Sequence, residues 1–179
     1  MIEFINPVIA AVRSDEQYKK ALKSDVSVIF MLKADILTIS ELIKEKLDKK
    51  VFVHVDMAEG VGKDKKGIEL LKNLGVDGII TTKNSLISCA KELCLITVQR
   101  FFIIDSGSVA TALESASQTK PDFAELMPGV IPKAIKSFIK KTHIPIISGG
   151  LIEDKNDIIN ALSAGAEAVS TGKEELWNE

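Results

Sequence analysis

Short apolar runs alternate with longer segments of helical periodicity along the whole chain. The runs are rich in Val, Ile and Phe, which is typical of buried strands, and the segments between them place apolar residues three or four positions apart, which is typical of helices. Eight strands are predicted: Val8–Val12, Val26–Leu32, Val51–Asp56, Gly78–Thr82, Leu95–Arg100, Phe123–Met127, Pro145–Ser148 and Ala168–Ser170.

Several intervening segments carry helix-start signals. Ser14 with Gln17, and Thr38 with Glu41, have the spacing of a capping box, in which two side chains satisfy free backbone donors reciprocally. The spacing also predicts a helix over Asp64–Leu74 and another that begins at Asp154. The last residues, Lys173–Glu179, predict a short final helix docked by Trp177.

Strands separated by crossover helices form parallel sheets, because parallel neighbours need long connections. Eight such repeats are the number that closes a barrel. We therefore expect an α/β fold, a compact (β/α)8 TIM barrel in one domain over residues 1–179, with short loops.

Composition agrees with a globular chain, since 46% of residues are hydrophobic and 27% are charged. The net charge of −2 argues against binding nucleic acid through the overall field, so any RNA contact needs a local patch. Lysines cluster at 44–50, 63–66 and 133–141; we interpret them first as solvated helix faces, with RNA contact by one cluster as the alternative. The apolar run Val8–Val12 is too short for a signal peptide or membrane span, so we expect a cytoplasmic protein with no membrane partner.

Cys89 and Cys94 lack metal-ligand spacing, and the chain has only two histidines, His54 and His143. We expect two reduced thiols, and neither a metal nor a cofactor.

Functional groups of a TIM barrel lie at the carboxyl ends of its strands. Alternation along the third strand turns His54 and Asp56 inward together, either as a structural hydrogen-bonded pair or as ligand contacts. Arg13 and Arg100 end two other strands and are candidate anion clamps. Three further candidates are Asp105, a possible partner of Arg100; the inward-facing Glu125; and Gly129, which follows the sixth strand.

The last two strands carry the phosphate prediction. Ser148, Gly149 and Gly150 end the seventh strand, and Ser170 and Thr171 end the eighth. Glycines let backbone N–H groups approach an anion, and in barrels a phosphate often lies between these two loops. The order of the two loops favours a phosphorylated ligand.

Together, the segments at these strand ends resemble those of the glycerol-3-phosphate-responsive antiterminators. The resemblance is carried by Asn6–Arg13, His54-Val55-Asp56, Asp77–Thr82, Thr97–Arg100, Pro121–Glu125, Met127–Lys133, Pro145–Ile152 and Ala168–Thr171. It implies a regulator that binds sn-glycerol 3-phosphate and acts on the leader mRNA of glycerol-utilisation genes. It also implies phosphate contacts from Gly149, Gly150, Ser170 and Thr171, and hydroxyl contacts from His54, Asp56 and Glu125, with Arg13 or Arg100 supplying charge.

Two other functions stay open at this point. The first is a small barrel enzyme on a phosphorylated polyol or sugar, with His54, Asp56 and Glu125 as acid and base, or a desolvated Lys33 as a Schiff base. The second is a ligand-binding barrel whose output is a protein partner. We favour the regulator over the enzyme, and the residues leave a homo-oligomer open.

Overall fold

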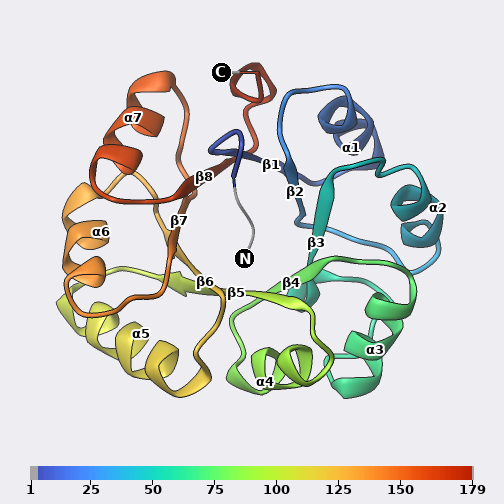
Figure 1. Ribbon diagram of the computed structural model, residues 1–179, viewed down its shortest axis with the longest axis horizontal. Coiled ribbons are helices and arrows are strands. Elements are labelled where there is room, and N and C mark those ends of the chain that lie inside the picture. Colours follow the sequence, from blue (N-terminus) through green and yellow to red (C-terminus); the bar gives the residue numbers. More distant parts are fainter. Residues whose placement is uncertain (1–3, 179) are drawn as a thin grey trace.

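The computed structural model describes residues 4–178, and its eight parallel strands close into a barrel in sequence order (Figure 1). The strands are β1 (Val8–Val12), β2 (Val28–Met31), β3 (Lys50–His54), β4 (Gly78–Thr81), β5 (Ile96–Phe102), β6 (Phe123–Met127), β7 (Ile146–Gly149) and β8 (Ala168–Thr171). The β1–β8 pairing, which aligns Val8 with Val169, closes the ring. The predicted (β/α)8 TIM barrel is confirmed.

A ring of helices surrounds the strands in Figure 1. They are α1 (Asp15–Leu22), α2 (Ile39–Lys44), α3 (Lys65–Asn73), α4 (Asn84–Glu92), α5 (Ser106–Thr119), α6 (Pro132–Ile139) and α7 (Lys155–Ser163), with 3-10 turns η1 (Val55–Met57) and η2 (Glu174–Leu176). The short η2 takes the place of an eighth helix. Trp177 is buried beside it and donates from Nε1 to Thr171 O at 2.9 Å, as the predicted docking role requires. Residue 179 of the predicted last helix lies outside the described residues.

Two strand ends differ from the prediction in ways that affect the mouth. The third strand stops at His54, because the chain turns there into η1, so Asp56 leaves the alternation of the strand. The fifth strand runs on past Arg100 to Phe102, pairing with β6 as far as Met127. Alternation therefore holds at Arg100 and Glu125 and fails at Asp56.

The predicted helix caps have mixed outcomes. Ser14 accepts from Gln17 N as expected, but the Gln17 side chain accepts from Arg13 N rather than completing the box. The box at Thr38 is wrong, because Thr38 has helical backbone angles and makes no side-chain cap. Asp64 and Asp154 do cap α3 and α7.

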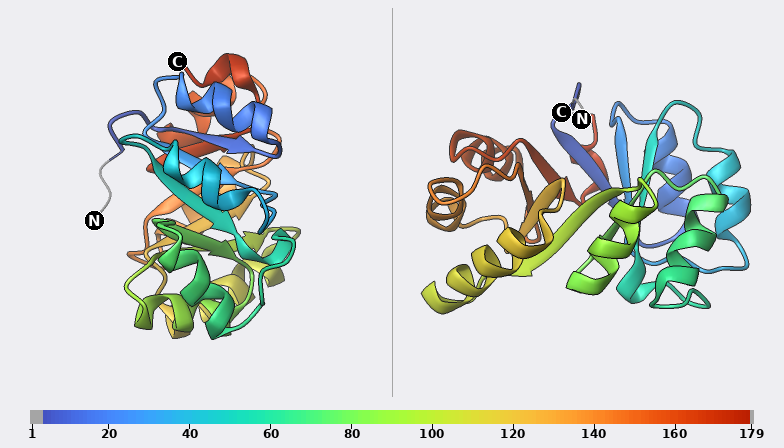
Figure 2. Two further views of the ribbon diagram at one scale, coloured as in Figure 1. Left: turned by 90° about the vertical axis from the view of Figure 1, so that its right-hand side faces the viewer. Right: turned by 60° about the horizontal axis from the view of Figure 1, so that its bottom comes forward.

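Apolar residues form two layers, one inside the barrel and one between the barrel and the helices. Inward positions such as Ile9, Phe52 and Ile147 form the first, and their neighbours along each strand form the second. Phe4 closes the amino end of the barrel by packing edge-on against Phe123, with ring centroids 5.4 Å apart. In the left view of Figure 2 the dark blue segment before β1 lies on the side opposite the strand arrowheads. The packing of Phe4 fills this amino end, so the carboxyl end remains for a site.

Candidate functional site

The carboxyl ends of β5 to β8, together with β1, surround a cavity of about 350 Å³. We call it the mouth cavity. Its lining residues are Ala11, Arg13, Gln17, Leu32, Arg100, Glu125, Met127, Gly150–Glu153 and Ser170–Lys173. The volume lies at the small end of the range for small-molecule sites, which suits a compact ligand.

A buried chain of polar side chains forms the cavity floor. Arg100 and Glu125 are aligned in the β5–β6 ladder and both face inward. Arg100 Nε donates to Glu125 Oε2 at 2.6 Å, and Ser170 Oγ donates to Glu125 Oε1 at 2.7 Å. Arg100 is 7% exposed and Glu125 is 0% exposed, so the carboxylate is stable there only because both oxygens are paired.

The guanidinium of Arg100 retains unused donors. Its Nη1 and Nη2 groups donate to no residue in the described part of the chain, and Arg100 lines the cavity. An arginine whose Nε is fixed by a carboxylate holds its remaining donors in a rigid fork, which matches two oxygens of a phosphate or carboxylate. Arg100 is therefore presented to the cavity as an oriented anion donor.

Gly149 has no side chain, and this leaves room for the hydrogen-bonded side chains of Glu125 and Ser170. A Cβ there would meet Ser170 Oγ and lie 2.5 Å from Glu125 Oε1. The missing side chain at β7 thus lets the carboxylate reach across from β6 to β8.

Arg13 and Lys173 add positive charge at the rim. Both are exposed, and neither forms an ion pair with another residue between 4 and 178. With Arg100 offset by Glu125, these two cations face a single remaining acid of the lining, Glu153. The rim favours an anionic ligand.

The loop that connects β6 to α6 holds the glycine loop after β7 in place through hydrogen bonds. Gly129 N donates to Gly150 O at 2.9 Å, and Ser148 Oγ donates to Gly129 O at 2.8 Å. Gly150 has φ +79°, a left-handed conformation that favours glycine, and it lines the cavity. Ser148, Gly149 and Gly129 are not among the lining residues, so they shape the loop from outside the cavity.

Thr171 holds the same loop from the β8 side. Its Oγ1 donates to Ile152 O at 2.9 Å and accepts from Lys173 N at 3.1 Å. The loops after β7 and β8 are therefore joined where the phosphate was predicted to bind.

His54 and Asp56 lie away from this arrangement. Asp56 Oδ1 accepts from Thr81 Oγ1 at 2.6 Å, and Oδ2 accepts from Thr82 N at 2.8 Å and Thr82 Oγ1 at 2.9 Å. His54 Nε2 is 3.6 Å from Asp56 Oδ2, is buried, and has no hydrogen-bond partner in the described chain. Neither residue lines the mouth cavity.

The pKa of Asp56 reflects two opposing effects. Burial raises it, but the His54 imidazole and the hydrogen bonds from Thr81 and Thr82 together hold the pKa well below its usual range. The carboxylate is thus kept ionised by the β4–α4 loop, so the geometry favours the structural pair. A ligand contact by His54 or Asp56 stays a prediction.

Asp105 has a different partner from the one suggested for it. Its carboxylate caps α5 by accepting from Ser108 N at 2.8 Å, whereas Arg100 pairs with Glu125. Asp105 lies at the edge of a separate groove between α5 and α6.

Among the lining residues that the sequence interpretation missed are Gln17, Met127, Leu151, Glu153 and Lys173. A signal existed for Met127, which continues the inward alternation of β6 beyond Glu125. The others belong to loops or to a helix start, where no periodicity fixes the direction of a side chain.

The described residues form neither a metal-ligand cluster nor a membrane-spanning helix. Between residues 4 and 178, no three His, Cys, Asp or Glu side chains come together as a metal site. None of the helices in that range has the length and apolar character that a membrane crossing requires.

Comparison with known proteins identifies the family that this chain resembles. A family model described as "Glycerol-3-phosphate responsive antiterminator" matches residues 8–177. The chain is 37% identical over 175 residues to the Escherichia coli protein YgcP, covering 96% of this chain and 92% of that protein. It superposes with a TM-score of 0.92 on a glycerol uptake operon antiterminator regulatory protein from Listeria monocytogenes, at 32% identity over 97% of this chain and 95% of the other. For an antiterminator-related protein from Thermotoga maritima the TM-score is 0.85, at 31% identity, with coverage of 95% and 96%.

Proposed function

This chain belongs to the family of glycerol-3-phosphate responsive antiterminators, and we propose that it binds sn-glycerol 3-phosphate in the mouth cavity and acts on the leader mRNA of glycerol-utilisation genes. The observation that carries the ligand half is Arg100, fixed by Glu125 with its Nη groups open to a cavity of about 350 Å³. The proposed action on leader mRNA is supported by membership of an antiterminator family.

The phosphate lies against the Arg100 fork, with Arg13 and Lys173 adding charge from the rim. Arginine donors and a close backbone approach at Gly150 suit a tetrahedral anion. Gly129, Ser148, Gly149 and Thr171 support the site by holding the two loops together.

The glycerol hydroxyls contact polar atoms beside the phosphate. Each Glu125 oxygen already accepts one hydrogen bond and has capacity for a second. Ser170 Oγ donates to Glu125 and can still accept from a ligand hydroxyl. These contacts would give sn-glycerol 3-phosphate a higher affinity than inorganic phosphate, which has no glycerol hydroxyls.

A ligand can switch RNA binding only if RNA has different affinities for the free and liganded states. We expect glycerol 3-phosphate to strengthen binding of the leader transcript, because the ligand would stabilise one arrangement of the mouth loops and RNA would bind that arrangement better. Equal RNA affinity with and without ligand would contradict the regulatory half.

No observation favours the enzyme alternative over the regulator. Lys33 pairs with Glu59 at 3.2 Å, and its side chain is 62% exposed. Schiff-base lysines are desolvated so that their pKa falls, and Lys33 lacks that surrounding. His54 and Asp56, the proposed acid and base, do not line the cavity.

A thermal-shift titration with sn-glycerol 3-phosphate tests the ligand half, with glycerol and inorganic phosphate as controls. Ligand at about 100 times its Kd stabilises by roughly 2.7 kcal/mol, which for this size raises Tm by about 5–10 °C. Arg13→Gln should reduce the shift, and Lys19→Gln, a matched loss of one exposed cation outside the cavity, should not. No shift, or an equal shift with phosphate alone, would overturn the proposal.

A further inference from the structure

Positive charge is distributed unevenly along the chain. Residues 126–152 contain four lysines and neither Asp nor Glu, whereas the rest has 19 Lys and Arg against 25 Asp and Glu. A protein of net charge −2 therefore carries one segment of charge +4 within a remainder of −6. That segment includes α6, the β6–α6 loop that braces Gly150, and Gly150 itself.

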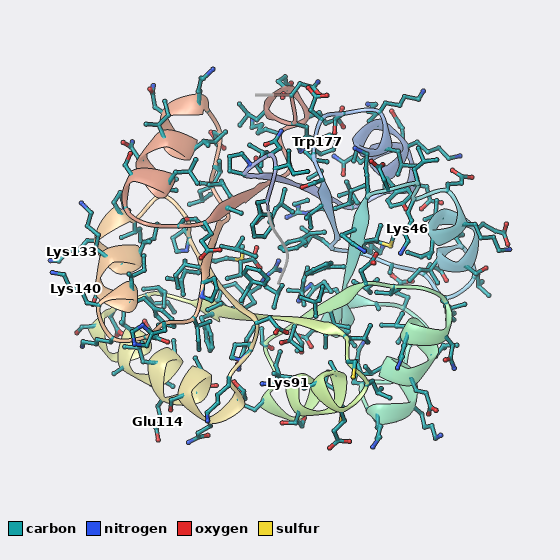
Figure 3. All side chains as sticks on the ribbon, viewed as in Figure 1. Lys46, Lys91, Glu114, Lys133, Lys140 and Trp177 are labelled. Carbon is teal, nitrogen blue, oxygen red and sulfur yellow. The ribbon has the colours of Figure 1, made fainter. Side chains whose placement is uncertain are left out.

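The lysines of this segment are exposed and unpaired. Lys133, Lys136, Lys140 and Lys141 form no ion pair with a residue in the described range. Figure 3 shows Lys133 and Lys140 pointing outward from α6, away from the barrel. We call these four residues the α6 lysines.

Several lysines elsewhere are neutralised by nearby acids. Lys46 pairs with Asp77 at 2.7 Å, and Lys65 pairs with Glu92 at 2.6 Å. Lysines on solvated helix faces of this protein thus often have acidic partners. The α6 lysines lack them, which leaves their charge available to an anionic partner.

An apolar groove lies beside these lysines, between α5 and α6. Its volume is about 350 Å³, and its walls include Ile103, Val109 and Ala134, with Lys133 and Lys141 also lining it. Its one acid, Asp105, is occupied in capping α5. The groove lining therefore combines apolar surface with two lysines against one acid.

Two large apolar side chains are exposed on the segment that follows Arg100, and one of them, Ile104, lines the groove. Phe102 is 57% exposed and Ile104 is 88% exposed, and both follow the inward Arg100 along the chain. Exposed apolar side chains among cations are the elements of a single-stranded nucleic-acid site, in which bases pack on apolar surface and phosphates meet lysines.

We propose that a single-stranded segment of RNA binds along the α5–α6 groove, with its phosphates on the α6 lysines and bases on Phe102 and Ile104. This inference rests on the proposed function, since that function supplies RNA as the anionic partner. Charge complementarity selects the face: within residues 126–152 no carboxylate repels a phosphate. The helix spans roughly 12 Å along its eight residues, about the length of two nucleotides, so the groove is one part of a longer interface.

The groove is also connected to the mouth cavity. Ile103, in its wall, donates from its backbone N to Met127 O at 2.7 Å, and Met127 lines the mouth cavity. Gly129, three residues before α6, donates to Gly150 O beside the predicted phosphate. Ordering of these loops by a ligand would fix the start of α6 and the groove together, which couples the two sites.

Fluorescence anisotropy with a labelled leader RNA tests this assignment. The variant removes all four α6 lysine charges (Lys133→Gln, Lys136→Gln, Lys140→Gln, Lys141→Gln). The matched control removes four other exposed lysine charges that have no described ion pair (Lys19→Gln, Lys23→Gln, Lys72→Gln, Lys83→Gln). We expect Kd for RNA to rise about 10- to 100-fold in the first and less than about twofold in the second. The salt slope should shrink by about 0.7 for each RNA phosphate that no longer meets a lysine.

A second variant separates base contacts from charge. Phe102→Ala should raise Kd about tenfold without changing the salt slope, because a stacking contact releases no counterions. Both variants should keep the thermal shift with sn-glycerol 3-phosphate, which shows that they fold.

The outcomes distinguish this inference from the function on which it rests. Wild-type RNA affinity in the α6 variant would overturn the assignment and leave the proposed function intact. A wild-type protein that shifts with glycerol 3-phosphate but binds no RNA would overturn both the assignment and the mRNA half of the function. Binding of polyglutamate in place of RNA would reassign the face to an acidic protein and overturn the proposal.

Discussion

The ends of β3 and β4 and the ends of β5, β6 and β8 carry similar polar side chains, yet only the second group opens on the mouth cavity. Asp56 and Glu125 illustrate the contrast, since each carboxylate accepts at least two hydrogen bonds from its neighbours. The hydrogen bonds that Thr81 and Thr82 donate to Asp56 hold the start of the β4–α4 loop in place. A donor to Glu125 is Arg100, which lines the cavity and whose Nη groups donate to no residue in the described part of the chain.

A polar strand end contributes to a ligand site through the hydrogen-bonding capacity that remains unused. Thr81 and Thr82 direct their hydroxyls to Asp56, whereas Arg100 uses one donor and retains two Nη groups. A fixed carboxylate can thus act on a ligand through the cation it orients. Variants at these strand ends test that distinction, and those expected to change stability or binding most come first.

Glu125→Ala should produce the largest change. It leaves Arg100 buried without its carboxylate, and breaking a buried ion pair by removing one partner lowers the free energy of unfolding by about 3–5 kcal/mol. Urea denaturation measures the loss, and the thermal shift with sn-glycerol 3-phosphate should disappear.

A double variant separates stability from binding. Arg100→Met with Glu125→Leu replaces the pair by apolar side chains of similar volume, which is often neutral for stability. We expect it to regain most of the stability and none of the ligand response. A single Glu125→Ala variant within about 1 kcal/mol of wild type would show that the pair is not the anchor of this region.

Arg100→Lys should affect binding more than stability. Lysine keeps the charge beside Glu125 but lacks the planar fork that can hold Glu125 and a phosphate together. Loss of hydrogen bonds to a charged group is worth about 1.5–3 kcal/mol, so we expect Kd for glycerol 3-phosphate to rise roughly 10- to 150-fold by isothermal titration calorimetry. An unchanged Kd would remove Arg100 from the phosphate site.

Much of this fold could be predicted from the sequence because barrel strands are buried on both faces and their apolar runs are continuous. The bounds of β1 and β6 agree with the prediction, and the inward direction of Glu125 followed from alternation with Phe123 and Met127. The Gly149–Gly150 loop was placed correctly between β7 and β8 by its order in the chain.

The remainder depended on long-range contacts. Alternation predicted that His54 and Asp56 share a direction, but the chain leaves β3 after His54 and gives Asp56 to the β4–α4 loop. The partner of Arg100 lies 25 residues away in the next strand, whereas Asp105, nearer in sequence, caps its own helix. Proximity along the chain does not determine such pairs, because ladder register brings distant residues together.

Asp56→Asn should lower the stability of the protein without lowering its affinity for sn-glycerol 3-phosphate. The folded-state pKa of Asp56 is depressed, so the ionised carboxylate stabilises the protein above its unfolded pKa of about 4, and this contribution is lost as pH falls below that value. At pH 7 the variant should be less stable by about 1–2 kcal/mol, and the difference should narrow towards pH 2–3. Urea denaturation across this range measures it. A difference that does not depend on pH would contradict the charge assignment, and a raised Kd would place Asp56 at the ligand.

His54→Leu should change stability and ligand affinity least. It also tests whether the ends of β3 and β4 lie outside the ligand site. His54 Nε2 is buried without a partner and lies 3.6 Å from Asp56 Oδ2. Replacing it removes an unsatisfied polar atom but also weakens support for Asp56, so the two effects should cancel to within about 1 kcal/mol.

The Kd for sn-glycerol 3-phosphate in His54→Leu should stay within about twofold of wild type, because His54 does not line the cavity. Ser170→Ala is the matched control inside the cavity, where loss of the hydroxyl that donates to Glu125 should weaken binding. If His54→Leu instead weakens binding as much as Ser170→Ala does, with stability unchanged, then the unpartnered imidazole contacts a ligand hydroxyl. The ligand would then reach across the barrel from β8 to β3, and both groups of strand ends would form one site.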